Sequence, residues 1–124
     1  MIISTVNAPK AIGPYSQAVV AGNLLFISGC CPFSPEDGSV TSETIGDQSK
    51  RALDNLQAVV EAAGADMSKV VKTTCFISDM NNFAEFNEIY ASYFNGSFPA
   101  RSCVEVARLP KDVLIEVEAI VNLK

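Results

Sequence analysis

Residues 113–122, close to the C-terminus, form a predicted strand that is apolar on both of its faces. One face carries an alternation of apolar side chains: Val113, Ile115, Val117, Ala119 and Val121. Leu114 and Ile120 add apolar side chains to the opposite face, and a strand of this kind needs cover on both sides of its sheet. A chain of 124 residues supplies one domain, residues 1–124, with one core. We therefore expect an oligomer, in which a second copy covers what the helices leave exposed.

Two helices are predicted to cover one face of this sheet. Residues 47–63 show an apolar period of three and four that ends at Gly64, formed by Ala52, Leu53, Leu56, Val59, Val60 and Ala63. Asn82 and Glu85 resemble a capping box that opens a second helix. Its apolar stripe is formed by Phe83, Phe86, Tyr90, Tyr93 and Phe94. Asn87 falls on the same side, where its amide either ties down a neighbouring loop or orients residues of a site.

Strands before, between and after the helices complete the predicted fold. Residues 15–21 and 24–28 flank Gly22-Asn23, a pair suited to a tight hairpin turn, with a further short strand before them. Residues 70–77 form a predicted buried strand, and a final pair of strands follows the second helix at 100–107 and 113–122. The fold class is therefore α+β, with a mixed sheet covered by two helices on one face.

The composition narrows the classes of function. A net charge of -5 without a basic cluster argues against nucleic acid as the main partner. The chain has no histidine, which excludes Ser-His and Cys-His nucleophile pairs, and its four cysteines lack the spacing of a disulfide framework or a zinc site. We expect no metal. No segment reaches the roughly 20 apolar residues that cross a bilayer, and no targeting signal is evident, so we expect a soluble cytoplasmic protein.

Arg101 is the first candidate for a binding residue. It shares one side of the strand at 100–107 with Cys103 and Glu105. A buried guanidinium requires an anion, and its planar fork matches a carboxylate through two charge-assisted hydrogen bonds. The carboxylate belongs either to a ligand or, in a structural ion pair, to Glu105, Glu116 or Glu118. Spacing alone leaves both possibilities open.

Two kinds of side chain could move protons. Glu116 and Glu118 share the less regularly apolar side of the last strand, where each is either simply solvated or, if partly buried, able to exchange protons with water or a leaving amine. Tyr15 emerges from a turn fixed by Gly13 and Pro14. Its hydroxyl either reaches a site or belongs to an amphipathic surface aromatic.

Several blocks of the sequence are together typical of one family. They are residues 11–18 (AIGPYSQA), 27–29 (ISG), 71–74 (VKTT), 99–106 (PARSCVEV) and 115–120 (IEVEAI). These blocks resemble the RidA (YjgF) family of reactive intermediate deaminases, and the resemblance covers almost the whole chain. The C-terminal blocks are the most specific.

The resemblance implies a chorismate-mutase-like α+β fold that assembles as a homotrimer, with sites in clefts between subunits. It also implies hydrolysis of 2-enamino or 2-imino acids, such as 2-iminobutanoate and 2-iminopropanoate, to 2-keto acids and ammonia. No cofactor is expected, because an imine carbon is already electrophilic and a positioned water with proton transfer can suffice.

The resemblance further implies roles for individual residues. Arg101 would hold the substrate carboxylate, while Gly29 and Cys103 would contribute backbone groups. Glu116 would orient or activate the attacking water and assist the departure of ammonia. The pocket would be completed by Tyr15, which we group with the catalytic residues, and by Ser28 and Asn87.

One residue departs from the family pattern, and one other function stays open. Cys30 follows Ser28-Gly29 at a position where many active relatives have glutamine, so the substrate preference or rate here could differ. The alternative function is a non-catalytic trimeric binding protein that senses small 2-keto or related carboxylic acids. A ribonuclease or translation-inhibitor role, attributed to some relatives, is disfavoured by the net charge.

Overall fold

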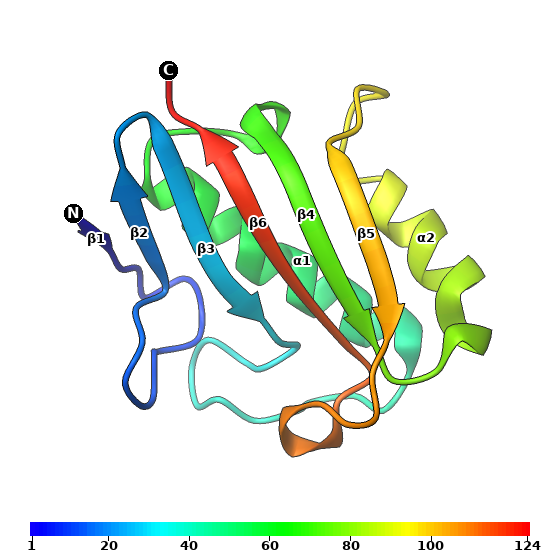
Figure 1. Ribbon diagram of the computed structural model, residues 1–124. Helices are drawn as coiled ribbons and strands as arrows, with labels where there is room; N and C mark the ends of the chain where they lie inside the picture. The colour runs from blue at the N-terminus through cyan, green and yellow to red at the C-terminus, as the bar shows by residue number, and fades with distance from the viewer.

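A mixed sheet forms the framework of the structure, which is a computed structural model describing residues 1–124. Its six strands are β1 (Ile2–Ile3), β2 (Ala18–Ala21), β3 (Leu24–Cys30), β4 (Val70–Ile77), β5 (Ala100–Glu105) and β6 (Ile115–Asn122). They lie in the order β1-β2-β3-β6-β4-β5. Helices α1 (Ile45–Ala62) and α2 (Phe83–Ala91) both lie against one face of the sheet (Figure 1). The predicted α+β arrangement is confirmed.

Helix α1 supplies much of the core. Its first turn is capped by Thr44, whose hydroxyl accepts a hydrogen bond from the Asp47 amide at 3.2 Å. The predicted apolar stripe is buried, and Leu53 and Leu56 are fully inaccessible to solvent. Each such side chain contributes about 1.5–3 kcal/mol when it leaves water. Gly64 follows the end of the helix as predicted, and its φ of 82° lies outside the α-helical region.

Helix α2 carries the predicted aromatic stripe, but its start differs from the prediction. The Asn82 side chain makes no capping hydrogen bond, so the capping box is wrong. A 3₁₀ turn, Met80–Asn82, leads into the helix instead, and Asp79 caps that turn by accepting from the Asn81 amide. Three buried aromatic rings then pack in sequence with centroids 5.6 and 5.0 Å apart, namely Phe86, Tyr90 and Phe94.

The last two strands are not neighbours, which corrects the expected final pair. β4 and β5 pair in parallel through the α2 crossover, and β6 enters between β3 and β4, antiparallel to both. A parallel pair requires a long crossover connection, whereas β6 can return directly to the centre of the sheet. As a result β5 forms one edge of the sheet, while β6 lies in the middle (Figure 1).

The sheet face opposite the helices is uncovered and carries exposed apolar side chains. Val19, Phe26 and Val104 point to this face from three different strands and leave 42%, 43% and 46% of their surface exposed. Ile120 and Phe76 lie between them and are half-buried. The sequence led us to expect that the helices would leave one face of the sheet uncovered, and the structure has such a face. Neither helix is long and apolar enough to cross a membrane.

Candidate active site

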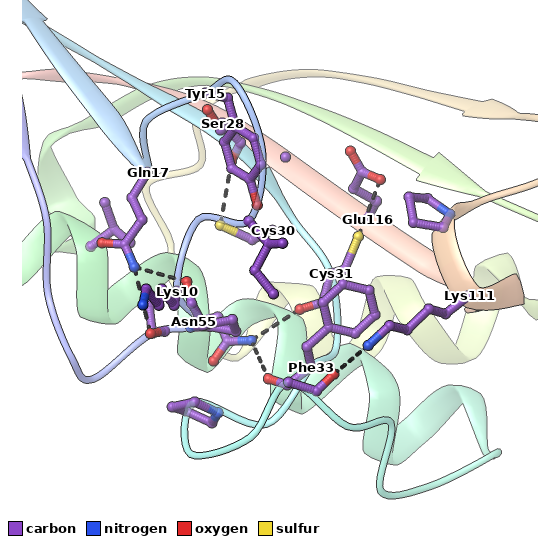
Figure 2. A pocket seen from close by; sticks show the side chains of 18 of the residues that line it. Lys10, Tyr15, Gln17, Ser28, Cys30, Cys31, Phe33, Asn55, Lys111 and Glu116 are labelled. Carbon is purple, nitrogen blue, oxygen red and sulfur yellow. Dashed lines mark hydrogen bonds between the residues drawn. The ribbon is translucent and has the colours of Figure 1, made fainter.

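A cavity of about 690 Å³ lies beside the ends of β3 and β6. Four of the predicted site residues line it together, namely Tyr15, Ser28, Gly29 and Glu116. They come from the N-terminal segment, from β3 and from β6, and the side chains of Tyr15, Ser28 and Glu116 gather around one opening (Figure 2). The cavity thus joins residues that are about 100 positions apart in the sequence.

Local backbone geometry holds Tyr15 and Ser28 in place. Gly13 adopts a φ of 116°, a conformation that favours glycine, and its carbonyl accepts from the Tyr15 amide at 2.9 Å. The Ser28 hydroxyl donates to the carbonyl of Ser16 at 2.6 Å. Gln17 is buried, and its amide group donates to the Pro9 carbonyl at 2.8 Å while its oxygen accepts from the Thr5 amide. These bonds fasten the N-terminal segment against β3.

The absence of a side chain at Gly29 allows the Glu116 carboxylate to pack against the backbone. The pairing of β3 with β6 shifts register between Ile27 and Cys30, which marks a bulge around Gly29. A Cβ atom at position 29 would lie 1.9 Å from Oε2 of Glu116. The half-buried carboxylate can therefore rest directly over this backbone only because residue 29 has no side chain.

Two thiols adjoin the same carboxylate. Cys31 Sγ donates to Glu116 Oε1 at 3.2 Å, while Cys30 Sγ donates to the Ser28 carbonyl at 3.4 Å (Figure 2). Burial and then the charge of Glu116 raise the pKa of Cys30 to about 12, and the same causes raise the pKa of Cys31. Both thiols are hydrogen-bond donors in this structure, and the raised pKa values favour the protonated form that donates.

A second hollow of about 380 Å³ surrounds Arg101 between α2 and the start of β5. Arg101 Nη1 donates to Asn87 Oδ1 at 2.7 Å, and its guanidinium carbon lies 4.8 Å from the ring centroid of Tyr90 and 5.4 Å from that of Phe83. The rings attract the cation through their π faces. Asn87 thus orients the Arg101 side chain and does not tie down a loop.

No carboxylate of the chain neutralises Arg101. The only ion pair in the structure joins Arg108 and Asp112 on the surface, so the hypothesis of a structural ion pair for Arg101 is wrong. Glu105 instead accepts from the Met80 amide at 2.8 Å. The Arg101 guanidinium is half-buried among neutral groups, and it remains available to an external anion.

A buried hydrogen bond stiffens the wall of this second hollow. Tyr90 and Thr73 share a hydrogen bond of 2.7 Å between their hydroxyl oxygens, and both residues are buried. Burial raises the pKa of Tyr90 above its usual value, although the bond to Thr73 opposes this effect. The ring below the guanidinium is therefore fixed at its far end as well as by packing.

Arg101 and Glu116 lie on opposite faces of the sheet. Arg101 stands opposite Thr73, which is buried on the helix side, whereas Glu116 stands opposite Phe76 on the uncovered side. The two predicted catalytic groups therefore line separate hollows within one chain. A small ligand cannot contact both side chains of the same subunit.

Cys103 lines neither hollow. It follows Arg101 by two positions on the same side of β5 and stands opposite Cys75 of β4. Burial raises the pKa of Cys103, and the nearby Arg101 partly offsets that rise. Because β5 is an edge strand, part of its backbone has no neighbouring strand and is free to contact a ligand or a partner.

Comparison with known proteins identifies the relatives of this chain. Residues 5–123 match the family described as Endoribonuclease L-PSP. The 2-iminobutanoate/2-iminopropanoate deaminase of Escherichia coli K12 is 53% identical over 121 residues, which are 95% of this chain and 94% of that protein. The chain belongs to this family. The resemblance to the RidA (YjgF) proteins is thereby confirmed.

Solved structures of the family agree closely with the fold. The YjgF gene product of E. coli superposes with a TM-score of 0.95 at 50% identity, covering 100% of this chain and 99% of that one. E. coli TdcF, solved with bound serine, gives 0.94 at 46% identity over 98% of both chains. The single-domain α+β architecture is therefore that of the family.

The sequence did not predict the residues that contact the charged groups of Arg101 and Glu116. The aromatic stripe was visible, but nothing showed that Phe83 and Tyr90 would stack on Arg101, because that contact joins different elements. The bond from Cys31 to Glu116 spans 85 positions and had no local signal. Among the side chains that commonly bind metals, no group of three or more converges anywhere in the chain.

Proposed function

We propose that this protein hydrolyses 2-imino acids, such as 2-iminobutanoate and 2-iminopropanoate, to 2-keto acids and ammonia. The observation that carries the proposal is the guanidinium of Arg101, which faces a hollow without a carboxylate partner. The negative charge of a substrate carboxylate complements the guanidinium, whose planar fork can donate two parallel hydrogen bonds to it. The name of the E. coli relative and the serine bound to TdcF support a small amino-acid-like ligand.

The proposed assembly is a homotrimer in which each site is shared by two subunits. Arg101 and Glu116 belong to opposite faces of one sheet, so one ligand can reach both groups only if two chains contribute. The uncovered apolar face around Phe26 and Val104 provides surface for such contacts. One subunit would supply the carboxylate-binding side, and its neighbour would supply the cavity with Glu116.

The proposed reaction needs binding, a positioned water and proton transfer. Arg101 holds the carboxylate and fixes the imine carbon, and Glu116 accepts a proton from the water that attacks that carbon. The C=N π electron pair moves to nitrogen, which takes up a proton from solvent. Glu116 then returns to the amine nitrogen the proton that it accepted from the water. The C–N bond breaks with its electron pair leaving on ammonia, and the C=O bond forms as the new hydroxyl group gives up its proton to solvent. Tyr15 and Ser28 place hydroxyl groups along the cavity that receives the water.

A coupled assay tests this activity. An amino-acid oxidase or threonine dehydratase generates the imine in place, and the rate of imine loss is followed with and without the protein. We expect acceleration by the wild-type protein and none by Arg101→Ala. Arg108→Ala is the matched control, because Arg108 is an exposed arginine paired only with Asp112. Imine loss no faster than in buffer would refute the proposed activity.

Mixed oligomers test the shared site. Arg101→Ala subunits alone should be inactive and Glu116→Gln subunits alone should keep only a small residual rate, but unfolding and refolding the two together should restore activity. In an equal random mixture about one quarter of the sites would combine an intact Arg101 with an intact Glu116 from the neighbour. No recovery in a mixture of proven oligomers would contradict the shared site.

The alternative is a binding protein that senses 2-keto acids without turnover. Cys30, at a position where many active relatives have glutamine, is the feature that favours it. Ligand binding that is lost in Arg101→Ala, together with no imine hydrolysis by the wild-type protein, would support this alternative.

A further inference from the structure

We propose that Cys31 is a positioning residue, whose thiol orients the Glu116 carboxylate for proton transfer. The inference rests on the proposed hydrolysis and extends it to a residue to which the sequence alone assigned no role. The contact is direct, since Cys31 Sγ lies 3.2 Å from Glu116 Oε1 and donates its proton to that oxygen (Figure 2).

The backbone of Cys31 is anchored from helix α1. Asn55, which is 1% exposed, donates from Nδ2 to the carbonyl oxygens of Cys31 and Phe33, both at 2.9 Å (Figure 2). Arg51 holds the other end of this amide, because its Nη2 donates to Asn55 Oδ1 at 2.9 Å. The loop that carries the thiol is therefore tied to the core, and the thiol approaches Glu116 from a fixed direction.

The surroundings of the Cys31 side chain are otherwise apolar. Cys31 is 8% exposed and packs in a small buried cluster with Leu109 and Val113. A buried side chain in such a cluster is ordinarily aliphatic. Here the thiol supplies a donor at the one side where the cluster meets a carboxylate. A valine could fill the same space without that donor, which makes Cys31→Val a suitable test.

The two carboxylate oxygens of Glu116 have different neighbours. Oε1 accepts from Cys31, whereas Oε2 lies over the backbone of Gly29 toward the cavity. A donor on Oε1 restrains rotation of the carboxylate and leaves Oε2 for the attacking water. Because burial raises the pKa of Cys31, the thiol keeps its proton and remains a donor.

Kinetics of three variants test the role of Cys31. We expect Cys31→Val to lower kcat about threefold to tenfold, the range that one modest hydrogen bond supports, with KM little changed. Cys31→Ser keeps a donor and should restore kcat. In a Glu116→Gln background, Cys31→Val should cause no further loss.

These kinetic outcomes also define refutation. A Cys31→Val protein with wild-type kcat, or a Cys31→Ser protein with as low a kcat as Cys31→Val, would overturn the role. So would an equal loss in the Glu116→Gln background, because that loss could not act through the carboxylate. Thermal unfolding of each variant is measured in parallel, and Cys75→Val, which removes a buried thiol outside both hollows, is the matched control for lost thiol packing.

An infrared measurement separates this inference from the proposed function. The difference between wild-type and Cys31→Val spectra isolates the S–H stretch of Cys31 without any substrate. Glu116→Gln should shift that band toward the frequency of a weaker hydrogen bond, and an unchanged band would overturn the inference. If the band shifts but the wild-type protein hydrolyses no imine, the proposed function has failed and the catalytic role of Cys31 falls with it, although the contact stands.

Discussion

Replacement of Gly29 by alanine should separate folding from activity. The new Cβ would lie 1.9 Å from Oε2 of Glu116, whereas an ordinary van der Waals contact begins at 3.4 Å, so the carboxylate must retreat by about 1.5 Å. The atom that yields is the far end of a flexible side chain, and Gly29 does not have a positive φ. The backbone can therefore keep its conformation, and we expect little change in thermal stability.

The effect on catalysis should be much larger. A displacement of about 1 Å in a group that aligns the reacting atoms can cost about 100-fold, which corresponds to about 2.7 kcal/mol of barrier. We expect kcat/KM of Gly29→Ala to fall by at least this factor. The retreat would also break the bond from Cys31 to Oε1, which adds to the loss.

The assay is imine hydrolysis with the imine generated in place, accompanied by thermal unfolding. Gly46→Ala is the matched control, because its Cβ would lie 2.9 Å from Oε2 of Glu85, a carboxylate outside both hollows. That variant should fold and retain activity. A folded Gly29→Ala protein with kcat/KM within about threefold of wild type would refute the importance of the carboxylate position.

Three further predictions concern stability and assembly. Tyr90→Phe leaves the buried Thr73 hydroxyl without its partner, so the free energy of unfolding in urea should fall by about 1–3 kcal/mol; an unchanged value would contradict a structural role for this bond. Val104→Asp places a charge on the uncovered apolar face and should lower the oligomer mass measured by light scattering, whereas an unaltered mass would place the interface elsewhere. Burial raises the pKa of Cys75 from 9.0 to about 12. As the pH rises, the thiol therefore ionises in the unfolded chain before it ionises in the folded protein. The contribution of the protonated thiol to the free energy of unfolding is complete below pH 9 and is lost as the pH rises toward 12. Cys75→Val should therefore weaken the decline in unfolding free energy over that window, and an identical decline would refute this cause.

The sequence was sufficient where one local pattern dominated. The eight-residue strand β4 occupies the predicted residues 70–77, which are rich in the strand-forming residues Val, Thr, Phe and Ile. Helix α1 begins two residues before the prediction and ends one residue short of it, since only capping details decide helix ends. Of the candidate residues, Tyr15, Ser28, Gly29 and Glu116 lie around one cavity, whereas Arg101 and Asn87 line another.

The remaining features depend on contacts between distant segments. β6 pairs with β3 and β4 and not with β5, the strand that precedes it in the sequence. No turn signal in the sequence indicates this position. Whether Arg101 meets a carboxylate or the amide of Asn87 depends on which element packs over β5. The capping box at Asn82 failed because a 3₁₀ turn precedes the helix and Asp79 caps it. Local sequence thus indicates which residues can pair or cap, and tertiary packing determines which of these contacts form.

The neutral setting of Arg101 has a consequence for turnover. Its guanidinium is held by an amide and two aromatic rings, none of which changes when a substrate is converted to a product. An imino acid, the corresponding keto acid and the parent amino acid all carry the same carboxylate. In the proposed enzyme Arg101 therefore binds the carboxylates of reactant and product equally well. Only the groups near Glu116 contact the atoms that change during the reaction. Accumulating keto acid should thus compete with fresh imine, which would make the protein self-limiting when its product is not removed.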